Sequence, residues 1–115
     1  MIPFEPSRGE IWLVDLAQTR EHGQSGKRPC LIISVDLFNH GPAGLVIALP
    51  ITTKARGIPF HVGVHPPEAG LKKPSFVKCE DVRSISKERL SHCLGAVSLE
   101  TLQSVNDRLR ILLEL

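Results

Sequence analysis

Residues 29–51 read PCLIISVDLFNHGPAGLVIALPI, two short apolar runs on either side of a turn signal. The runs, residues 29–35 and 45–51, are rich in Ile, Val and Leu, which favour β-strands. The segment NHGP at residues 39–42 is typical of a turn. We therefore expect the two runs to form an antiparallel pair of strands.

Four other segments have the composition of short strands: residues 9–15, 58–64, 76–82 and 94–97. Residues 18–27 hold almost nothing apolar, which predicts a surface loop after the first strand. Residues 86–90 begin with a serine that suits a helix N-cap, but this segment is long enough for only a turn or two.

From Ser98 onward the apolar residues recur with the period of a helix. One stripe carries Leu99, Leu102, Val105, Leu109, Leu112 and Leu113. Charged and polar residues fill the other side, so we expect an amphipathic C-terminal helix. Five or six short strands followed by one helix fit a small antiparallel barrel or a strongly twisted sheet. The predicted fold class is mainly β with a C-terminal helix.

The chain has 115 residues, of which 42% are hydrophobic and 23% charged, and this suits one domain spanning residues 1–115. No apolar stretch approaches the roughly 20 residues of a membrane-spanning helix, and residues 1–6 do not resemble a secretory signal. We therefore expect a cytoplasmic protein. Three cysteines, Cys30, Cys79 and Cys93, include no CxxC pair, so we expect reduced core thiols. The net charge of +2 identifies no nucleic-acid binder by itself.

Five segments, taken together, resemble those of one family of toxins. They are RGEIWLVDL at residues 8–16, QSGKRPCLIIS at 24–34, PITT at 50–53, GIPFHV at 57–62 and VKCEDVRSI at 77–85. Their order and spacing, with a helix at the end, are similar to the MazF/PemK family of toxin-antitoxin systems. The resemblance covers almost the whole chain.

This resemblance implies an SH3-like barrel of the MazF/PemK/CcdB type and, usually, a homodimer. It implies an mRNA interferase, an endoribonuclease that cuts single-stranded RNA at short sequences without a metal or other cofactor. It also implies an antitoxin partner that blocks the RNA groove. The sequence departs from the family at Gly23, where many members have Glu, and at Asp81, where Gln is more common. These departures concern the detailed chemistry and the target sequence.

Metal-independent RNA cleavage uses the neighbouring 2′-OH as nucleophile, so the protein must supply a base, an acid and cations. The resemblance places the family's key arginine at Arg28 and its active-site threonine at Thr52. Lys78 and Glu80 match the Arg and Asp of the R-C-D motif in PemK-like members. They are two residues apart in a predicted strand, so we expect both side chains on one face. His22 matches a histidine of some PemK-like members and could shuttle protons.

Five further residues lie in the predicted loop or at a strand end and are candidates for RNA contacts: Gln24, Ser25, Lys27, Thr53 and Lys54. Thr53 also competes with Thr52 for the catalytic position, and the resemblance favours Thr52. The other histidines have no motif and are expected to be structural or surface residues: His40, His61, His65 and His92.

Three functions are open from the sequence. The first is a sequence-selective endoribonuclease that leaves a 2′,3′-cyclic phosphate and a 5′-hydroxyl. The second is a CcdB-like toxin that poisons a topoisomerase, a class that shares the barrel but lacks the R-P and P-I-T-T pairing. The third is an inactive relative that binds only RNA or its antitoxin, as Gly23 and Lys78 allow. The presence of both the R-P and the P-I-T-T segments favours the nuclease. The scattered acidic residues fit a metal-dependent nuclease poorly.

Overall fold

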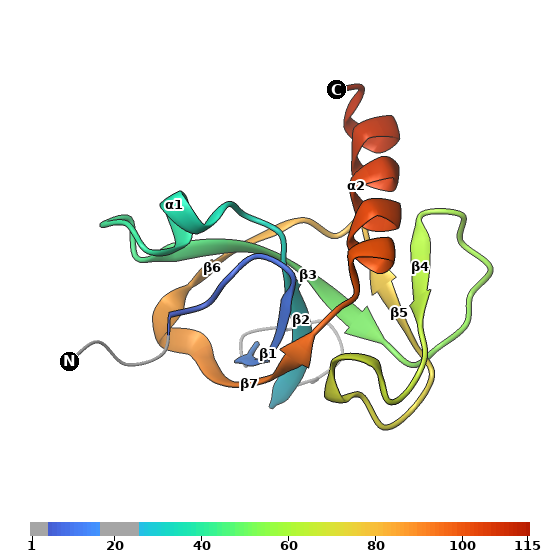
Figure 1. Cartoon of the computed structure of the whole chain (residues 1–115), viewed down its shortest axis with the longest axis horizontal. Helices are drawn as coiled ribbons and strands as arrows, with labels where there is room; N and C mark the ends of the chain where they lie inside the picture. The colour runs from blue at the N-terminus through green and yellow to red at the C-terminus, as the bar shows by residue number, and fades with distance from the viewer. Residues whose placement is uncertain (1–4, 17–25) are drawn as a thin grey trace.

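The computed structural model describes residues 5–16 and 26–115, which form one curved antiparallel sheet and a C-terminal helix (Figure 1). The elements in chain order are β1 (Glu10–Asp15), β2 (Lys27–Ile32), α1 (Asp36–Asn39), β3 (Leu45–Thr52), β4 (His61–Val64), η1 (Glu68–Gly70), β5 (Ser75–Lys78), β6 (Arg83–Ser86), η2 (Lys87–Arg89), β7 (Leu90–Ala96) and α2 (Leu99–Leu113). The predicted class, mainly β with a C-terminal helix, is confirmed.

Strand β3 is the centre of the sheet, whose order is β4-β5-β3-β2-β1-β7. On one side β3 pairs with β2, which confirms the antiparallel pair expected from residues 29–51. On its other side β3 pairs with two strands in succession, β6 along its first half and β5 at its end. In the described part of the chain the outer strands β4 and β7 do not pair, so the sheet is barrel-like without closing.

Alternate side chains of the strands build two apolar clusters on opposite faces of the sheet. The first cluster includes Leu31, Leu49 and Val77, and helix α2 covers it with Val105, which is fully buried. The second cluster consists of Trp12, Val14, Cys30, Ile32, Val46, Ala48 and Ile85. Membership of one cluster or the other shows on which face of the sheet a strand residue lies.

Helix α2 begins where the sequence predicts. The hydroxyl oxygen of its N-cap, Ser98, accepts a hydrogen bond from the backbone N–H of Thr101. The predicted apolar stripe is buried only in part, because Leu99 is 71% exposed and Leu113 is 52% exposed. The last turn of α2 extends past the end of the sheet (Figure 1), so Leu109 still packs against the first cluster whereas Leu113 is exposed.

The strand predicted at residues 76–82 is present but shorter than predicted. Strand β5 ends at Lys78, and a turn closed by the Asp81 N–H donating to the Lys78 carbonyl at 3.0 Å leads into β6. This turn is needed because β5 and β6 pair with different halves of β3. Strand β6 was not predicted at all.

Other boundaries also differ from the sequence prediction. β2 begins and ends earlier than residues 29–35, and α1 lies just before the predicted turn. β4 begins at His61 rather than at residue 58, because the His61 N–H closes a turn onto the Ile58 carbonyl at 3.0 Å. β7 starts four residues before the predicted segment, directly after η2.

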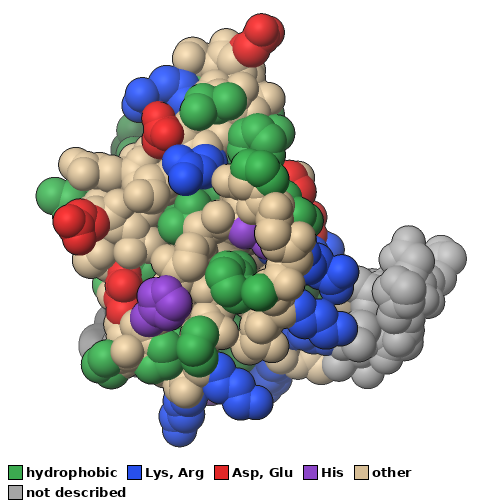
Figure 2. Space-filling view, turned by 90° about the vertical axis from the view of Figure 1, so that its right-hand side faces the viewer, with side chains coloured by type: hydrophobic (Ala, Val, Ile, Leu, Met, Phe, Trp, Pro, Cys, Tyr) green, Lys and Arg blue, Asp and Glu red, His purple; other side chains and the backbone are tan. Residues whose placement is uncertain are grey.

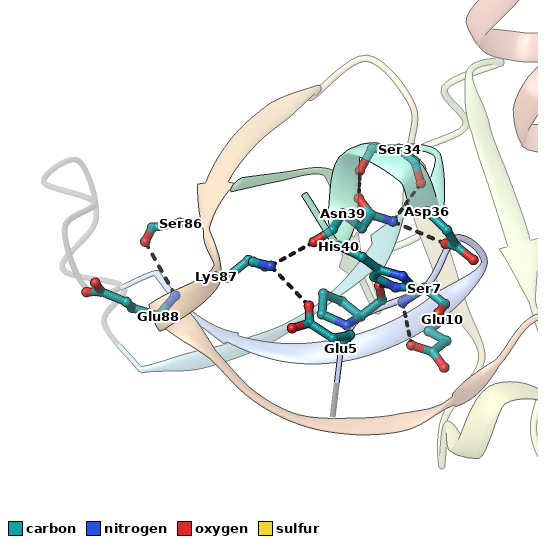
Figure 3. A network of polar contacts seen from close by, with 11 residues as sticks. Glu5, Ser7, Glu10, Ser34, Asp36, Asn39, His40, Ser86, Lys87 and Glu88 are labelled. Carbon is teal, nitrogen blue, oxygen red and sulfur yellow. Dashed lines mark hydrogen bonds and ion pairs between the residues drawn. The ribbon is translucent and has the colours of Figure 1, made fainter. Parts of the chain in front are cut away.

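A partly buried polar network fixes α1 and the end of β6 to the N-terminal segment (Figure 3). Asn39, fully buried, donates through Nδ2 to the Ser34 carbonyl at 2.8 Å. Lys87 Nζ donates to the Asn39 carbonyl at 2.8 Å and to Glu5 Oε1 at 3.0 Å. The Lys87 ammonium thus joins the N-terminal segment to α1 directly after β6, and the buried Asn39 amide has its hydrogen-bond partner.

Gly70 leaves no room for a side chain where η1 meets β7. A Cβ at this position would lie 2.3 Å from the Leu94 carbonyl oxygen, and φ is +73°. We expect Gly70→Ala to lower the free energy of unfolding by about 2–4 kcal/mol, as backbone strain and steric displacement add. Gly44 has the same φ and open space around it. Gly44→Ala should therefore cost only about 1 kcal/mol. Urea denaturation compares the two, and equal losses would contradict the close contact.

Candidate functional site

The register of the strands brings Arg28 and Thr52 together. Cys30 of β2 faces Pro50 of β3. The same register, continued by two residues on each strand, sets Arg28 across from Thr52. Thr52 in turn faces Phe76 of β5. These side chains therefore share the face of the sheet that carries the second cluster, near the end of β3 and the start of β2.

Lys78 and His61 lie on the same face of the next two strands, two residues along from the level of Thr52. Lys78 lies two residues after Phe76 in β5 and so points to the same face. His61 is the register partner of Lys78 on β4. Four neighbouring strands thus contribute one polar side chain each to a single face.

The Thr52 hydroxyl is held in a defined position. Its oxygen accepts a hydrogen bond from the Lys54 backbone N–H at 3.1 Å, which leaves the hydroxyl hydrogen to donate elsewhere. Thr52 is half-buried in β3, whereas Thr53 is exposed and follows the strand. Arg28 is exposed at the start of β2. A cation and a hydroxyl donor side by side suit the oxygens of a phosphate.

The prediction that Lys78 and Glu80 lie on one face of a strand is wrong, because β5 ends at Lys78. The turn gives each residue a different partner. Lys78 Nζ lies 3.6 Å from Asp81 Oδ2, and Glu80 Oε2 lies 3.0 Å from His61 Nε2. Glu80 still reaches the same region, since His61 faces Lys78 across the β4–β5 pair.

His61 belongs to this site, although no sequence motif points to it. Its side chain is only 4% exposed, while that of Glu80 is 35% exposed. Within the described residues, His61 Nδ1 is buried without a hydrogen-bond partner. The pair therefore presents a carboxylate to solvent with a buried imidazole behind it.

Arg83 is a second residue that sequence reasoning missed. It faces Ala48 in β3, on the same side of the sheet as Thr52. Asp81 accepts two hydrogen bonds from Arg83, at 3.0 Å from Nε and 3.1 Å from Nη2. Burial acts to raise the pKa of Asp81, but these bonds and the charges of Arg83 and Lys78 hold that pKa below its usual value.

The cysteines differ in their surroundings. Cys30 and Cys79 are fully buried, and burial raises the pKa of Cys30 to about 12 and that of Cys79 to about 11. Cys93 on β7 is exposed, so the expectation of three core thiols is wrong for it. Its pKa is also raised, by burial of part of the thiol and by the Glu10 carboxylate.

We expect one thiol to react with an aromatic disulfide reagent in the native protein at pH 8, and three after unfolding. The reactive thiol should be Cys93, because only its sulfur is reached by solvent and the thiolate is the attacking species. Cys93→Ser should abolish the native reaction. Fast native labelling of two or more thiols would contradict the burial of Cys30 and Cys79.

Several predicted site residues lie outside the described residues: His22, Gln24 and Ser25. Lys27 is exposed at the start of β2, and Lys54 is exposed just after β3. Seen from the side of β4, Lys and Arg side chains gather along one border and the lower end of the surface (Figure 2). In the described ranges no three His, Cys, Asp or Glu side chains converge as metal ligands would. None of the helices there is long and apolar enough to cross a membrane.

Comparisons with known proteins show the family and the fold. Residues 7–113 match the family model described as PemK-like, MazF-like toxin of type II toxin-antitoxin system. The chain is 33% identical over 113 residues to endoribonuclease MazF9 of Mycobacterium tuberculosis, covering 94% of this chain and 96% of that protein. A crystal structure of MazF from Deinococcus radiodurans has a TM-score of 0.82 at 28% identity, covering 98% of this chain and all of that one. An endoribonuclease from a mycobacterial species, solved with its cognate antitoxin, has a TM-score of 0.80 at 29% identity, covering 96% of each chain.

Proposed function

Because this chain belongs to the family of PemK-like, MazF-like toxins of type II toxin-antitoxin systems, we propose that it is an endoribonuclease. Its substrate is single-stranded RNA, cut at short preferred sequences. The observation that supports this proposal best is the row of Arg28, Thr52, Lys78 and His61 on one face of four strands. The MazF9 relative, itself an endoribonuclease, supports the same reaction class.

The proposed reaction is an internal transfer at phosphorus. The 2′-oxygen of the nucleotide before the cut attacks the phosphorus as its proton leaves, and the bond from phosphorus to the 5′-oxygen breaks. The products are a 2′,3′-cyclic phosphate and a 5′-hydroxyl, and the 5′-oxygen takes up a proton. Negative charge builds up on the phosphate oxygens, where the Arg28 guanidinium and the Thr52 hydroxyl would bind.

Glu80 is the proposed proton-transfer group. Its carboxylate is partly exposed and is held at 3.0 Å by His61 Nε2, so it keeps one orientation towards the substrate. His61 is almost fully buried and acts through Glu80 rather than on RNA. Lys78 adds positive charge beside the phosphate. His22 remains the candidate for the second proton transfer.

Residues around this row would bind the rest of the RNA. Lys27 and Lys54 are exposed at the ends of β2 and β3 and would contact neighbouring phosphates, and Thr53 follows Thr52 into the same region. Gln24 and Ser25 are the proposed contacts to bases, since single-stranded RNA exposes its base edges to polar side chains.

We also propose two protein partners. The mycobacterial endoribonuclease of similar structure was solved with its cognate antitoxin, and we expect an antitoxin to bind and inhibit this chain as well. A homodimer is the second proposed assembly. Size-exclusion chromatography with light scattering would give the mass of the free protein.

The decisive experiment incubates the purified protein with a long single-stranded RNA in EDTA and maps the ends. Discrete cuts with 5′-hydroxyl and 2′,3′-cyclic phosphate ends are expected. A 2′-deoxy nucleotide placed before a cut should block it, because the nucleophile is then missing. Cleavage that EDTA abolishes would contradict the metal-independent reaction. Failure to cut diverse RNAs would contradict the nuclease and direct attention to topoisomerase inhibition.

A further inference from the structure

Lys78 of the proposed catalytic row belongs to a cluster of three charged residues, and the other two, Asp81 and Arg83, have no assigned role. Lys78 ends β5, Arg83 begins β6, and Asp81 lies in the turn between them. Their side chains are 32%, 36% and 26% exposed, respectively. The three side chains are thus half-buried, between the second apolar cluster of this sheet face and solvent.

The cluster lies over the part of β3 that leads to Thr52. Strand β3 pairs with β6 up to Ala48 and with β5 from Ile51, so the turn holding Asp81 spans the gap between these two pairings. Cys30 is fully buried on the same face. Burial raises its pKa most, and the charges of Arg83 and Asp81 act on that pKa in opposite directions. Arg83 faces Ala48 and Cys30 faces Pro50, so the cluster lies along β3 on the side of Ala48, on the same face as Thr52.

Asp81 contacts both cations. Its two oxygens accept the Nε and Nη2 hydrogens of Arg83 in a bidentate pair, and its Oδ2 lies 3.6 Å from Lys78 Nζ. A bidentate pair fixes the plane of a guanidinium, which a single contact does not. One carboxylate between two cations also leaves the cluster with a net charge of +1 rather than +2.

We propose that Asp81 is a positioning residue of the RNA site, one that orients Lys78 and Arg83 and limits their combined charge so that the RNA backbone binds in one register. This inference rests on the proposed function. Without Asp81, the two cations would attract phosphates from many registers, because phosphate contacts carry no sequence information themselves.

The variants Asp81→Asn, Asp81→Glu and Arg83→Lys separate orientation from charge. Asp81→Asn should bind RNA of unrelated sequence about 10-fold more tightly at low salt. The slope of log affinity against log salt should steepen by about 0.7, the value for one added phosphate contact on a single strand. Its kcat should fall about 10-fold while KM falls or stays constant. Asp81→Glu should restore most of the selectivity. Arg83→Lys should lose selectivity without changing the salt slope, since the charge is kept and the fork is lost.

Asp107→Asn is the matched control, because Asp107 also pairs with an arginine, Arg108, at 3.2 Å on helix α2. Binding is measured with oligonucleotides that carry a 2′-deoxy nucleotide at the cut site, so it does not depend on cleavage. The inference is overturned if Asp81→Asn behaves like Asp107→Asn in selectivity and salt slope. It is also overturned if activity falls only in step with thermal stability. A wild type that binds RNA but never cuts it would refute the nuclease, and the binding data would still decide the role of Asp81.

Discussion

Replacing Arg28 with alanine is expected to reduce kcat/KM for RNA cleavage by about 10²- to 10³-fold, the usual effect of removing one donor to a developing charge. Arg28 is exposed at the start of β2 and lies across from Thr52 in the continued register. Its guanidinium can bind two phosphate oxygens at once as the 2′-oxygen attacks. Because an exposed side chain away from the core contributes little to stability, the free energy of unfolding should change by less than about 0.5 kcal/mol.

Two variants serve as controls for this result. Arg28→Lys keeps the charge but loses the planar fork, so an intermediate rate is expected. Arg110→Ala removes an equal charge from the exposed end of helix α2 and should cut RNA like the wild type. Rates are measured with a short RNA containing one mapped cut, and folding is checked by circular dichroism. Wild-type cleavage by Arg28→Ala would remove this arginine from the site.

The fold could be predicted where a local pattern decides the structure. The helical period of Leu102, Val105 and Leu109 predicts α2 because an amphipathic stripe is readable in sequence alone. Strand composition likewise locates β1, β2 and β3. The turn after Lys78 could not be predicted, because Val77 and Cys79 alternate with the charged Lys78 and Glu80 as they would in one strand. The break is set by tertiary pairing, since β3 must be shared between β5 and β6.

Site residues could be predicted from the sequence only where they lie in a recognisable motif. Arg28 and Thr52 came from the resemblance, and the strand register places them at one level. His61 and Glu80 are 19 residues apart and have no joint motif, so only the β4–β5 pairing and the following turn show that they meet. Because the turn is not visible in the sequence, the spacing of two residues suggested that Lys78 and Glu80 share one face of a strand. The turn instead brings Lys78 to its other acidic neighbour, Asp81.

The Glu80–His61 pair leads to the second large expected effect. Glu80→Gln should lower kcat by about 10²- to 10⁴-fold, the contribution of a general acid–base group, and leave RNA binding nearly unchanged. Glutamine has almost the same shape but can neither accept nor release the proton. Glu88→Gln is the matched control, since Glu88 is exposed on η2 outside the row of site residues. A Glu80→Gln enzyme with wild-type kcat would exclude Glu80 from proton transfer.

His61 should act only through Glu80, and a double-mutant cycle tests this dependence. His61→Ala should lower kcat about 10- to 100-fold, because the carboxylate loses the contact at 3.0 Å that orients it. His61→Gln, whose amide can still donate to Glu80, should retain more activity. The double variant His61→Ala/Glu80→Gln should be no slower than Glu80→Gln alone, since a positioning residue has nothing left to position. If the two losses multiply, His61 contributes to the reaction independently. If His61→Ala lowers only the melting temperature and leaves kcat intact, the pair is structural and the proton-transfer group must be sought elsewhere.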